Sequence, residues 1–438
     1  MTELEIAFAS IAAMLVLIYS GLHVAITLML VSLVSVWLMK GNIDLAANLM
    51  IAGFKDSISD YLFGVVPLFV LMGLVVSVAG IGRDTFDVAQ QAFRRILGGL
   101  GVATVAANAI FAAITGISIA SAAVFTKVAV PEMRRHGYTP HFSVGVVAGS
   151  AVLGMLIPPS LLFILYGVLT EQSVGDLFIA GVIPGLVLSA TYCLGIVAMA
   201  KWMPGFVGGQ GVSVDDMPRM SGAEMIAKIA PIVILVALVL GGIYGGIFTP
   251  TEAGAAGAAG ALIIAFARRR LGRRAFWQVL VQTGHTTSSI CFLIIGASLY
   301  SRMLALSGMP TWLGNTVLDA GFGVNGVVLA MILIMVLLGT ILDSASIMLL
   351  VLPIAVPILT GLQVDLVWLG VIAVLAVEIG LLTPPVGMSV YMVSIVARMP
   401  VSSVIRGILP FLLPLFLSLL VVSAFPAVST WLPHYFMQ

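Results

Sequence analysis

Apolar runs of about 20 residues, the length that lets an α-helix cross a lipid bilayer, recur from Ile6 to Trp431 with only short polar gaps. The composition agrees, because 61% of the 438 residues are hydrophobic and only 8% are charged, whereas soluble domains are about 25% charged. The runs leave no room for a soluble domain. We therefore predict an all-α polytopic membrane protein whose function lies within the bilayer.

Several classes of function are disfavoured by what the sequence contains. The net charge is only +1, so no basic surface argues for nucleic acid binding. Cys193 and Cys291 lie in apolar segments without the spacing of a metal site or a disulfide framework. The sequence contains no Gly-rich phosphate-binding loop, so it does not indicate a step driven by ATP. We assign no role to the five histidines.

Two short stretches interrupt the apolar runs with small, hydroxylated or helix-breaking residues. One is Ala113 to Ser121, which contains Thr-Gly-Ile-Ser, and the other is Leu156 to Ser160, which contains two prolines. In hydrocarbon an unpaired backbone group costs several kcal/mol, so such breaks persist only where protein or a water-filled cavity satisfies them. They indicate a binding site.

The first break is interpreted as the tip of a hairpin. Arg94-Arg95 and Arg134-Arg135 flank the segment Leu97 to Val130, and arginines favour the cytoplasmic side, so the chain must enter and return. Two complete spans would satisfy this, but Gly116 and the hydroxyls beside it favour a re-entrant hairpin at about residues 98–133. A crossing at 142–170, broken at Pro158-Pro159, follows it.

The second half repeats this plan. Arginines between Arg268 and Arg274 place that loop in the cytoplasm. We predict a second hairpin at about 323–360, turning around Leu342-Asp343-Ser344, and a second broken helix at 366–397, interrupted at Thr383-Pro384-Pro385. Segments 43–61 and 84–96 have the mixed polarity of helices that lie at the membrane surface.

Residues of the first half recur in the second half at one constant distance along the sequence, which we call the offset. It pairs Pro131 with Pro357, Pro158 with Pro384, Pro159 with Pro385, Ser118 with Ser344 and Gly154 with Gly380. We predict two repeats, 1–203 and 223–438, joined by a linker at 204–222. Each half is predicted to cross the membrane an odd number of times, so the two copies would have opposite orientations in the bilayer. Inverted repeats with broken helices are typical of secondary transporters that bind substrate and ions near the bilayer midplane.

The tips and breaks carry the residue types that bind a hard cation such as Na⁺, namely hydroxyls and freed carbonyls. An isolated Ser or Thr in a membrane helix more often bonds to its own helix. Asp343 lies within an apolar run, where a carboxylate costs roughly 2.5–3.5 kcal/mol, so we interpret it as functional, although it also suits a helix cap. Glu378 and Glu252 are weaker cases, and Glu252 also fits the first turn of a helix.

Two cationic residues have two possible roles each. Arg302 could bind the carboxylate of an anionic substrate through paired hydrogen bonds. It could equally extend its charge to the outer membrane surface. The same two interpretations apply to Lys127, on the returning arm of the first hairpin.

Six segments together resemble the large membrane subunit of tripartite ATP-independent periplasmic (TRAP) transporters. They are Ala107 to Ser118, Val130 to Tyr138, Ile157 to Ser160, Ala180 to Gly185, Phe248 to Ala253 and Gly380 to Gly387. The resemblance covers essentially the whole chain. It implies an inner-membrane, Na⁺-coupled importer of organic acids without any other cofactor, in which both hairpins move in an elevator-type transport domain against a scaffold. It also implies a small four-helix membrane subunit and a periplasmic substrate-binding protein as partners.

The resemblance further implies where ligands bind. The substrate residues would be Arg302, Ser118 and Ser344. The Na⁺ sites would use Thr115, Gly116, Ser118, Gly154 and Ile157 in the first repeat, and Gly339, Asp343, Ser344, Gly380 and Thr383 in the second. The first tip departs from the usual Ser-Gly-Ser-Ser of the family, because Thr115 and Ile117 replace two serines and one hydroxyl is lost.

Other functions remain as alternatives at this stage. A self-sufficient sodium–dicarboxylate symporter would share the architecture but need no partners. An intramembrane enzyme could use Asp343 and Glu378 as a carboxylate pair, although catalysis does not require the same break twice. A channel would conduct without a Na⁺ gradient. The substrate itself, whether a dicarboxylate, a sugar acid or an oxo acid, is not specified by the sequence.

Overall fold

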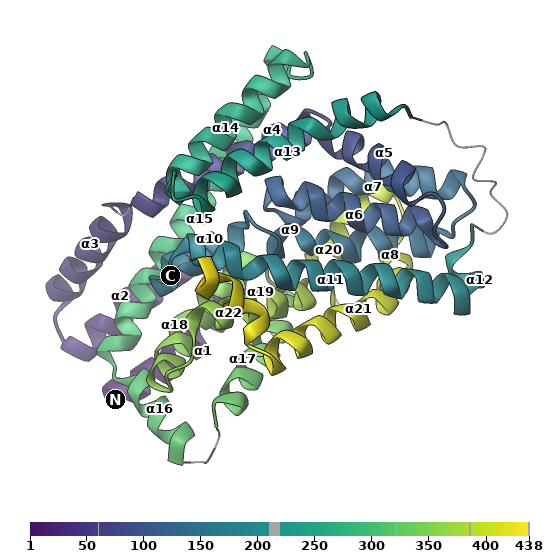
Figure 1. The fold of residues 1–438 in the computed structure, drawn as a ribbon. Coiled ribbons are helices and arrows are strands. Elements are labelled where there is room, and N and C mark those ends of the chain that lie inside the picture. The colour runs from purple at the N-terminus through teal and green to yellow at the C-terminus, as the bar shows by residue number, and fades with distance from the viewer. Residues whose placement is uncertain (60, 210–219, 320, 322, 385–386, 437–438) are drawn as a thin grey trace.

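The computed structural model describes residues 1–59, 61–209, 220–319, 321, 323–384 and 387–436 (Figure 1). The described chain folds into helices, with an isolated β-bridge between Tyr138 and Gly208. Seven of its helical segments, with Pro140–Thr170 counted as one, are long and apolar enough to cross a membrane, or eight if the bent pair Val65–Val78 and Ile81–Phe93 is counted as one span. The prediction of an all-α polytopic membrane protein is confirmed.

The helices of the first half begin and end as follows: α1 (Glu3–Tyr19), α2 (Val24–Lys40), α3 (Ile43–Ser59), the 3₁₀ turn η1 (Tyr61–Gly64), α4 (Val65–Val78), α5 (Ile81–Phe93), α6 (Gly99–Thr115), α7 (Ser118–Arg135), α8 (Pro140–Ala151), α9 (Leu153–Leu156), α10 (Leu161–Thr170), α11 (Val174–Trp202) and α12 (Pro204–Val207). Those of the second half are α13 (Gly222–Tyr244), α14 (Pro250–Ala267), α15 (Arg273–Leu306), α16 (Met309–Asp319), α17 (Val324–Gly339), α18 (Ser344–Gly361), α19 (Leu366–Leu382), α20 (Met388–Ala397), α21 (Val401–Ala424) and α22 (Ala427–Phe436).

The helix bounds repeat at the offset found in the sequence. Both ends of α7 and both ends of α18 are related by this offset, and so are those of α8–α9 taken together and of α19. The caps are also paired, because Thr139 accepts from the Phe142 amide at the start of α8 and Asp365 accepts from two amides at the start of α19. Two different N-capping side chains thus begin equivalent helices. The opposite orientation of the two repeats in the membrane stays a prediction.

The predicted hairpins and breaks have clear counterparts. Helices α6 and α7 are joined by Gly116-Ile117, and α17 and α18 by residues 340–343. Residues 157–160 separate α9 from α10, and residues 383–387 separate α19 from α20, where Pro385 lies outside the described residues. Of the predicted linker 204–222, residues 210–219 also lie outside them.

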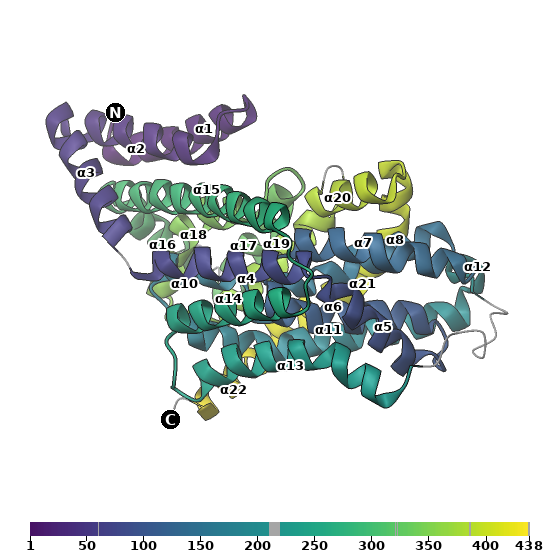
Figure 2. The same ribbon diagram turned by 90° about the horizontal axis from the view of Figure 1, so that it is seen from above.

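Helices of the first and the second repeat alternate in an outer layer. From above, the pair α1–α2 is followed by α15, α4, α14 and α13 (Figure 2). The contacts are equivalent, because α2 packs on α15 as α14 packs on α4. The hairpins and broken helices gather beside this layer, where α20 packs on α7 and α10 on α18. Each broken helix therefore contacts the hairpin of the other repeat.

One helix differs from its prediction as a surface helix over 84–96. Helix α5 begins at Ile81, bends by 63° from α4 and buries one face, including Asp84 and Phe86, beside α6 and α13. Tertiary packing covers this face, which the mixed polarity alone does not reveal.

A buried ionic cluster holds the bend between α4 and α5. Asp84, which is 4% exposed, accepts hydrogen bonds from Arg268 at 2.7 Å and from Arg270 at 2.9 and 3.3 Å. Arg270 also donates to the Ala79 carbonyl at 3.1 Å. Arginines that the sequence analysis treated as topology markers therefore also tie the loop between α14 and α15 to this bend.

We expect Asp84→Asn to lower the free energy of unfolding by about 3 kcal/mol, because removing one partner of a buried ion pair leaves uncompensated charge. Thermal unfolding of the purified full chain in detergent measures this. The matched control is Asp87→Asn, since Asp87 pairs with Lys228 where both side chains are about one third exposed. Its expected cost is under about 1 kcal/mol. Equal shifts for the two variants would contradict a structural role for the buried cluster.

Candidate functional site

The first hairpin tip rests on the first helix break. Gly116 ends α6 with φ 62°, in the left-handed region, and its carbonyl accepts from the Leu161 amide at 3.1 Å, directly beyond the break. A Cβ at Gly116 would lie 2.4 Å from the Pro159 carbonyl oxygen. Both the conformation and the close approach therefore require glycine here.

The second tip rests on the second break in the same way. The Thr340 carbonyl accepts from the Gly387 amide at 3.3 Å, and Gly387 is the repeat equivalent of Leu161. Gly339 and Gly380 are in backbone contact, since a Cβ on Gly339 would lie 2.6 Å from the Gly380 Cα. The structure therefore brings Gly339 and Gly380 together. It also brings Gly154 and Ser118 together in the first repeat, where a Cβ on Gly154 would lie 3.1 Å from the Ser118 Cα.

The two predicted threonine ligands bond to their own helices. The Thr115 hydroxyl donates to the Phe111 carbonyl at 3.0 Å, and the Thr383 hydroxyl donates to the Ile379 carbonyl at 2.7 Å. A hydroxyl that donates its hydrogen still has oxygen lone pairs with which it can bind a cation. Ile157 follows the last residue of α9, and its side chain packs against Gly185.

Asp343 is the N-cap of α18 at the second tip. Its Oδ2 accepts from the amides of Ala345 and Ser346 at 3.1 and 3.2 Å, and its Oδ1 accepts from the Ser346 hydroxyl. Ser344 is the first residue of the helix and is buried. The capping role of Asp343 is confirmed, and its role toward a cation stays a prediction.

Glu378 proves to be more central than the sequence analysis suggested. It lies on α19, is completely buried and accepts from the Ser118 hydroxyl at 3.3 Å. This contact joins the second broken helix to the tip of the first hairpin. One sequence signal distinguishes the residue, because Val152 occupies the equivalent position in the first repeat.

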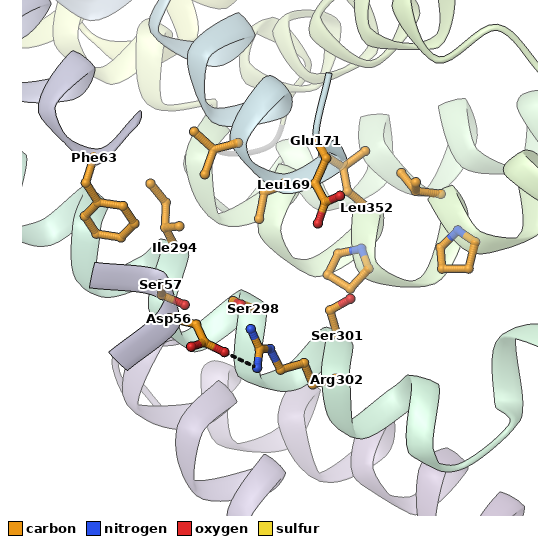
Figure 3. A pocket seen from close by; sticks show the side chains of 14 residues that line it. Asp56, Ser57, Phe63, Leu169, Glu171, Ile294, Ser298, Ser301, Arg302 and Leu352 are labelled. Atoms are coloured by element: carbon orange, nitrogen blue, oxygen red, sulfur yellow. Dashed lines mark hydrogen bonds and ion pairs between the residues drawn. The ribbon is translucent and has the colours of Figure 1, made fainter. Parts of the chain in front are cut away.

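Arg302 lies away from both tips, on α15. It pairs with Asp56 of α3 at 3.0 Å, with the two side chains 49% and 60% exposed. Figure 3 shows the pair facing a cavity of about 400 Å³, with Glu171 and Ser301 among the other lining residues. Among the described residues, α18 lines this cavity from Leu352 to Pro357, and neither Ser118 nor Ser344 is part of its wall. The three predicted substrate residues are therefore not brought together in this conformation.

Glu252 and Lys127 are the two remaining charged candidates. Glu252 accepts from the amide and the hydroxyl of Thr249 at 2.8 and 2.9 Å, which confirms its interpretation as a residue of the first helical turn. Lys127 lines a second cavity, of about 610 Å³, together with Arg83, Asp87 and Lys228.

This arrangement of spanning helices, paired hairpin tips and paired helix breaks is that of a polytopic membrane transporter. The family model "Tripartite ATP-independent periplasmic transporter, DctM component" matches residues 11–428. The chain belongs to this family of large permease subunits, and it is a multi-pass protein of the bacterial inner membrane. The resemblance found in the sequence is thereby confirmed.

Individual relatives differ in what they transport. The C4-dicarboxylate TRAP transporter large permease protein of Pseudomonas aeruginosa is 35% identical over 398 residues, which is 90% of each chain. The sialic acid TRAP transporter large permease protein of Vibrio cholerae is 31% identical over 433 residues, or 98% of each. Among solved structures, the YdaH transporter of Alcanivorax borkumensis shares the fold, with a TM-score of 0.57 and 13% identity over 86% of each chain. Because the relatives are permeases, the chain is a transporter, and the alternative of an intramembrane enzyme is excluded.

Proposed function

We propose that this protein imports a small organic acid by coupling its movement to Na⁺, as the large subunit of a three-part system. The observation that carries the proposal is the pair of equivalent tips, each resting on a helix break through a backbone hydrogen bond and a glycine contact. Such breaks offer carbonyls and hydroxyls near the midplane. The names of relatives, which include permeases for C4-dicarboxylates and sialic acid, support an organic acid as the substrate.

The proposed Na⁺ sites lie where each tip meets its break. In the first repeat the ligands would be the carbonyls and hydroxyls of Thr115, Gly116, Ser118, Gly154 and Ile157, and in the second those of Gly339, Asp343, Ser344, Gly380 and Thr383. The second site includes a carboxylate and the first, within its own repeat, has only neutral ligands. We therefore infer that the two sites differ in affinity for Na⁺.

The proposed movement is that of an elevator. The hairpins and broken helices would move as one unit against the outer layer formed by α1, α2, α15, α4, α14 and α13. In support, each broken helix packs on the hairpin of the other repeat, which links the hairpins into one body. A small membrane subunit and a periplasmic binding protein complete the proposed system.

Reconstitution in proteoliposomes tests the proposal. The genes beside this one should encode the two partners, and ligand-induced melting of the binding protein, screened with C4-dicarboxylates, sialic acids and sugar acids, selects the substrate. We expect uptake of that substrate only with both partners and an inward Na⁺ gradient. Uptake by this chain alone would instead support a self-sufficient symporter, and uptake without a Na⁺ gradient would support a channel.

We expect Arg302→Gln to raise the substrate concentration for half-maximal uptake by about tenfold, the effect of losing roughly 1.4 kcal/mol of binding. Its cavity has the size of a small-molecule site, about 300–1,000 Å³, and a guanidinium is the side chain best suited to a carboxylate. Thermal unfolding should change by less than about 1 kcal/mol, because the ion pair with Asp56 is exposed.

Asp56→Asn is the matched control for Arg302. It removes the same ion pair but leaves the guanidinium free to meet the substrate. Uptake that is half-maximal at an unchanged or lower substrate concentration is therefore expected. If both variants weaken uptake equally, the pair holds α3 to α15 and Arg302 does not bind substrate.

A further inference from the structure

We propose that Glu378 supplies the carboxylate of the first Na⁺ site, so that the second repeat provides the anionic ligand at the tip of the first. The inference rests on the proposed function and deepens it, because it adds to the first site a charged ligand from outside its own repeat. Hard cations are held by carboxylate, hydroxyl and carbonyl oxygens, and the proposed site includes the hydroxyl of Ser118, which contacts Glu378.

The carboxylate of Glu378 is buried without an opposite charge. Its side chain lies on α19 and is completely buried. Among the described residues, its Oε1 accepts from the Ser118 hydroxyl at 3.3 Å, whereas its Oε2 has no hydrogen-bond partner. The ion pairs of the described chain do not involve Glu378. Buried charges in proteins are as a rule paired or coordinate metal ions, so the free oxygen fits a cation at this place.

The contact with Ser118 places Glu378 at the first hairpin tip. Ser118 is the first residue of α7, and it is also adjacent to Gly154 of α9, another member of the proposed first site. Helix α9 packs on both α7 and α19. Because the Ser118 hydroxyl donates its hydrogen to Glu378, its oxygen keeps lone pairs for a cation. Oxygen ligands from both repeats therefore converge at this tip.

Helix α19 separates Glu378 from the second Na⁺ site. Glu378 and Gly380 are two residues apart, and successive residues of an α-helix are rotated by about 100°, so the two residues lie on nearly opposite faces of α19. Gly380 contacts Gly339 of α17 at the second tip, while Glu378 contacts Ser118 at the first. The carboxylate is therefore assigned to the first site, although its neighbour in the sequence belongs to the second.

Tyr192 of α11 is a second buried polar group near Glu378. Helix α11 packs on α19, and Tyr192 is completely buried and lies within electrostatic range of Glu378. Its hydroxyl has no hydrogen-bond partner among the residues described. A phenol hydroxyl is neutral, so it can orient the carboxylate but cannot cancel its charge.

The internal repeat shows that each tip then has one carboxylate. Asp343 provides it at the second tip, where the equivalent residue of the first tip is Ile117. The residue equivalent to Glu378 is Val152, which is also buried, so an apolar side chain suffices for packing there. The two carboxylates still differ, because Asp343 is partly exposed and caps α18, whereas Glu378 is completely buried.

Binding of radioactive Na⁺ to the purified full chain in detergent tests the inference, with choline replacing Na⁺ at constant ionic strength. The unmodified chain should bind one Na⁺ at each proposed site. In Glu378→Gln the amide oxygen can still accept from Ser118, but one of the two sites should weaken by about tenfold or more. Glu132→Gln, near the other end of α7, is the matched control and should bind normally, because its carboxylate pairs with the exposed Arg135.

A double variant identifies which site has weakened. Asp343→Asn alone is expected to weaken the second site, so Glu378→Gln combined with Asp343→Asn should weaken both. If the double variant binds Na⁺ as well as Asp343→Asn does, Glu378 does not belong to the first site and the proposal is overturned. Unaltered Na⁺ binding by Glu378→Gln would overturn it equally.

Thermal unfolding of the same samples separates a ligand from a structural residue. Without Na⁺, Glu378→Gln and Glu378→Val should unfold at no lower a temperature than the unmodified chain, because both remove a buried charge. Added Na⁺ should then raise their midpoints less than that of the unmodified chain. Lower midpoints for both variants without Na⁺ would show that the carboxyl group serves the fold, and would overturn the proposal.

A failure of the proposed function is recognised separately in these measurements. Absence of Na⁺ binding by the unmodified chain would overturn both Na⁺ coupling and the role of Glu378. Normal binding by the unmodified chain and by Glu378→Gln would overturn only the role of Glu378.

Discussion

Gly380→Ala is expected to abolish uptake and to lower the midpoint of thermal unfolding. A Cβ at this position would lie 2.7 Å from the Gly339 Cα and 2.8 Å from the Val336 carbonyl oxygen. Both obstacles are backbone atoms, so α17 must move away from α19. Overpacking of this kind costs about 1–3 kcal/mol, and it displaces the tip from the break on which the proposed second Na⁺ site depends.

Two other glycine variants complete the comparison. In Gly154→Ala the new Cβ would lie 3.1 Å from the Ser118 backbone, so a smaller loss is expected. Gly241→Ala on α13 meets nothing within 4 Å, and there the better helix propensity of alanine adds up to about 1 kcal/mol. Thermal unfolding and proteoliposome uptake should rank the variants in this order. Normal uptake by Gly380→Ala would show that the close contact of α17 and α19 is not needed for transport.

Asp343→Asn is expected to retain the fold but to raise the Na⁺ concentration for half-maximal uptake by about tenfold or more. Asparagine caps a helix as well as aspartate does, so the amides of Ala345 and Ser346 keep an acceptor. What is lost is the negative charge, which we propose binds Na⁺. Uptake measured against Na⁺ concentration, with thermal unfolding in parallel, separates the two roles.

Two variants serve as controls for Asp343. Asp343→Ala removes the cap as well and should lower the free energy of unfolding by a further ~1 kcal/mol. Asp365→Asn changes an aspartate with the same capping geometry at the start of α19, away from the tip, and should not alter the Na⁺ dependence. If Asp343→Asn also behaves like the unmodified protein, Asp343 is a helix cap and not a ligand.

The hairpins and breaks could be predicted because their signals are local. Prolines and glycines end helices wherever they occur, and long apolar runs between them form helices in a bilayer. The repeat strengthened each signal by showing it twice, and the predicted tips lie between α6 and α7 and between α17 and α18. The caps at Thr139 and Asp365 follow the same local chemistry.

The contacts of individual charged residues could not be predicted in this way. Glu378 and Ser118 are 260 residues apart in the sequence, and Arg302 and Asp56 are 246 apart. Whether such side chains meet depends on how α19, α7, α15 and α3 pack, which no local pattern encodes. Asp84 was missed for the same reason, since its partners are on the loop after α14.

The apolar runs, the breaks and the constant offset between the two halves by themselves determined that this protein is a membrane-spanning repeat protein of the transporter class. The apolar runs and the breaks act within one helix or between neighbouring turns, where composition and backbone stereochemistry decide the outcome, and the offset shows the same local signals a second time. Only the tertiary structure decided which charges are neutralised. It paired Asp84 with two arginines and Arg302 with Asp56, and it left Glu378 buried against the neutral hydroxyl of Ser118. The physical reason is that neutralising a charge in a low-dielectric interior depends on distances of a few ångströms, which are set by the packing of helices far apart in the chain.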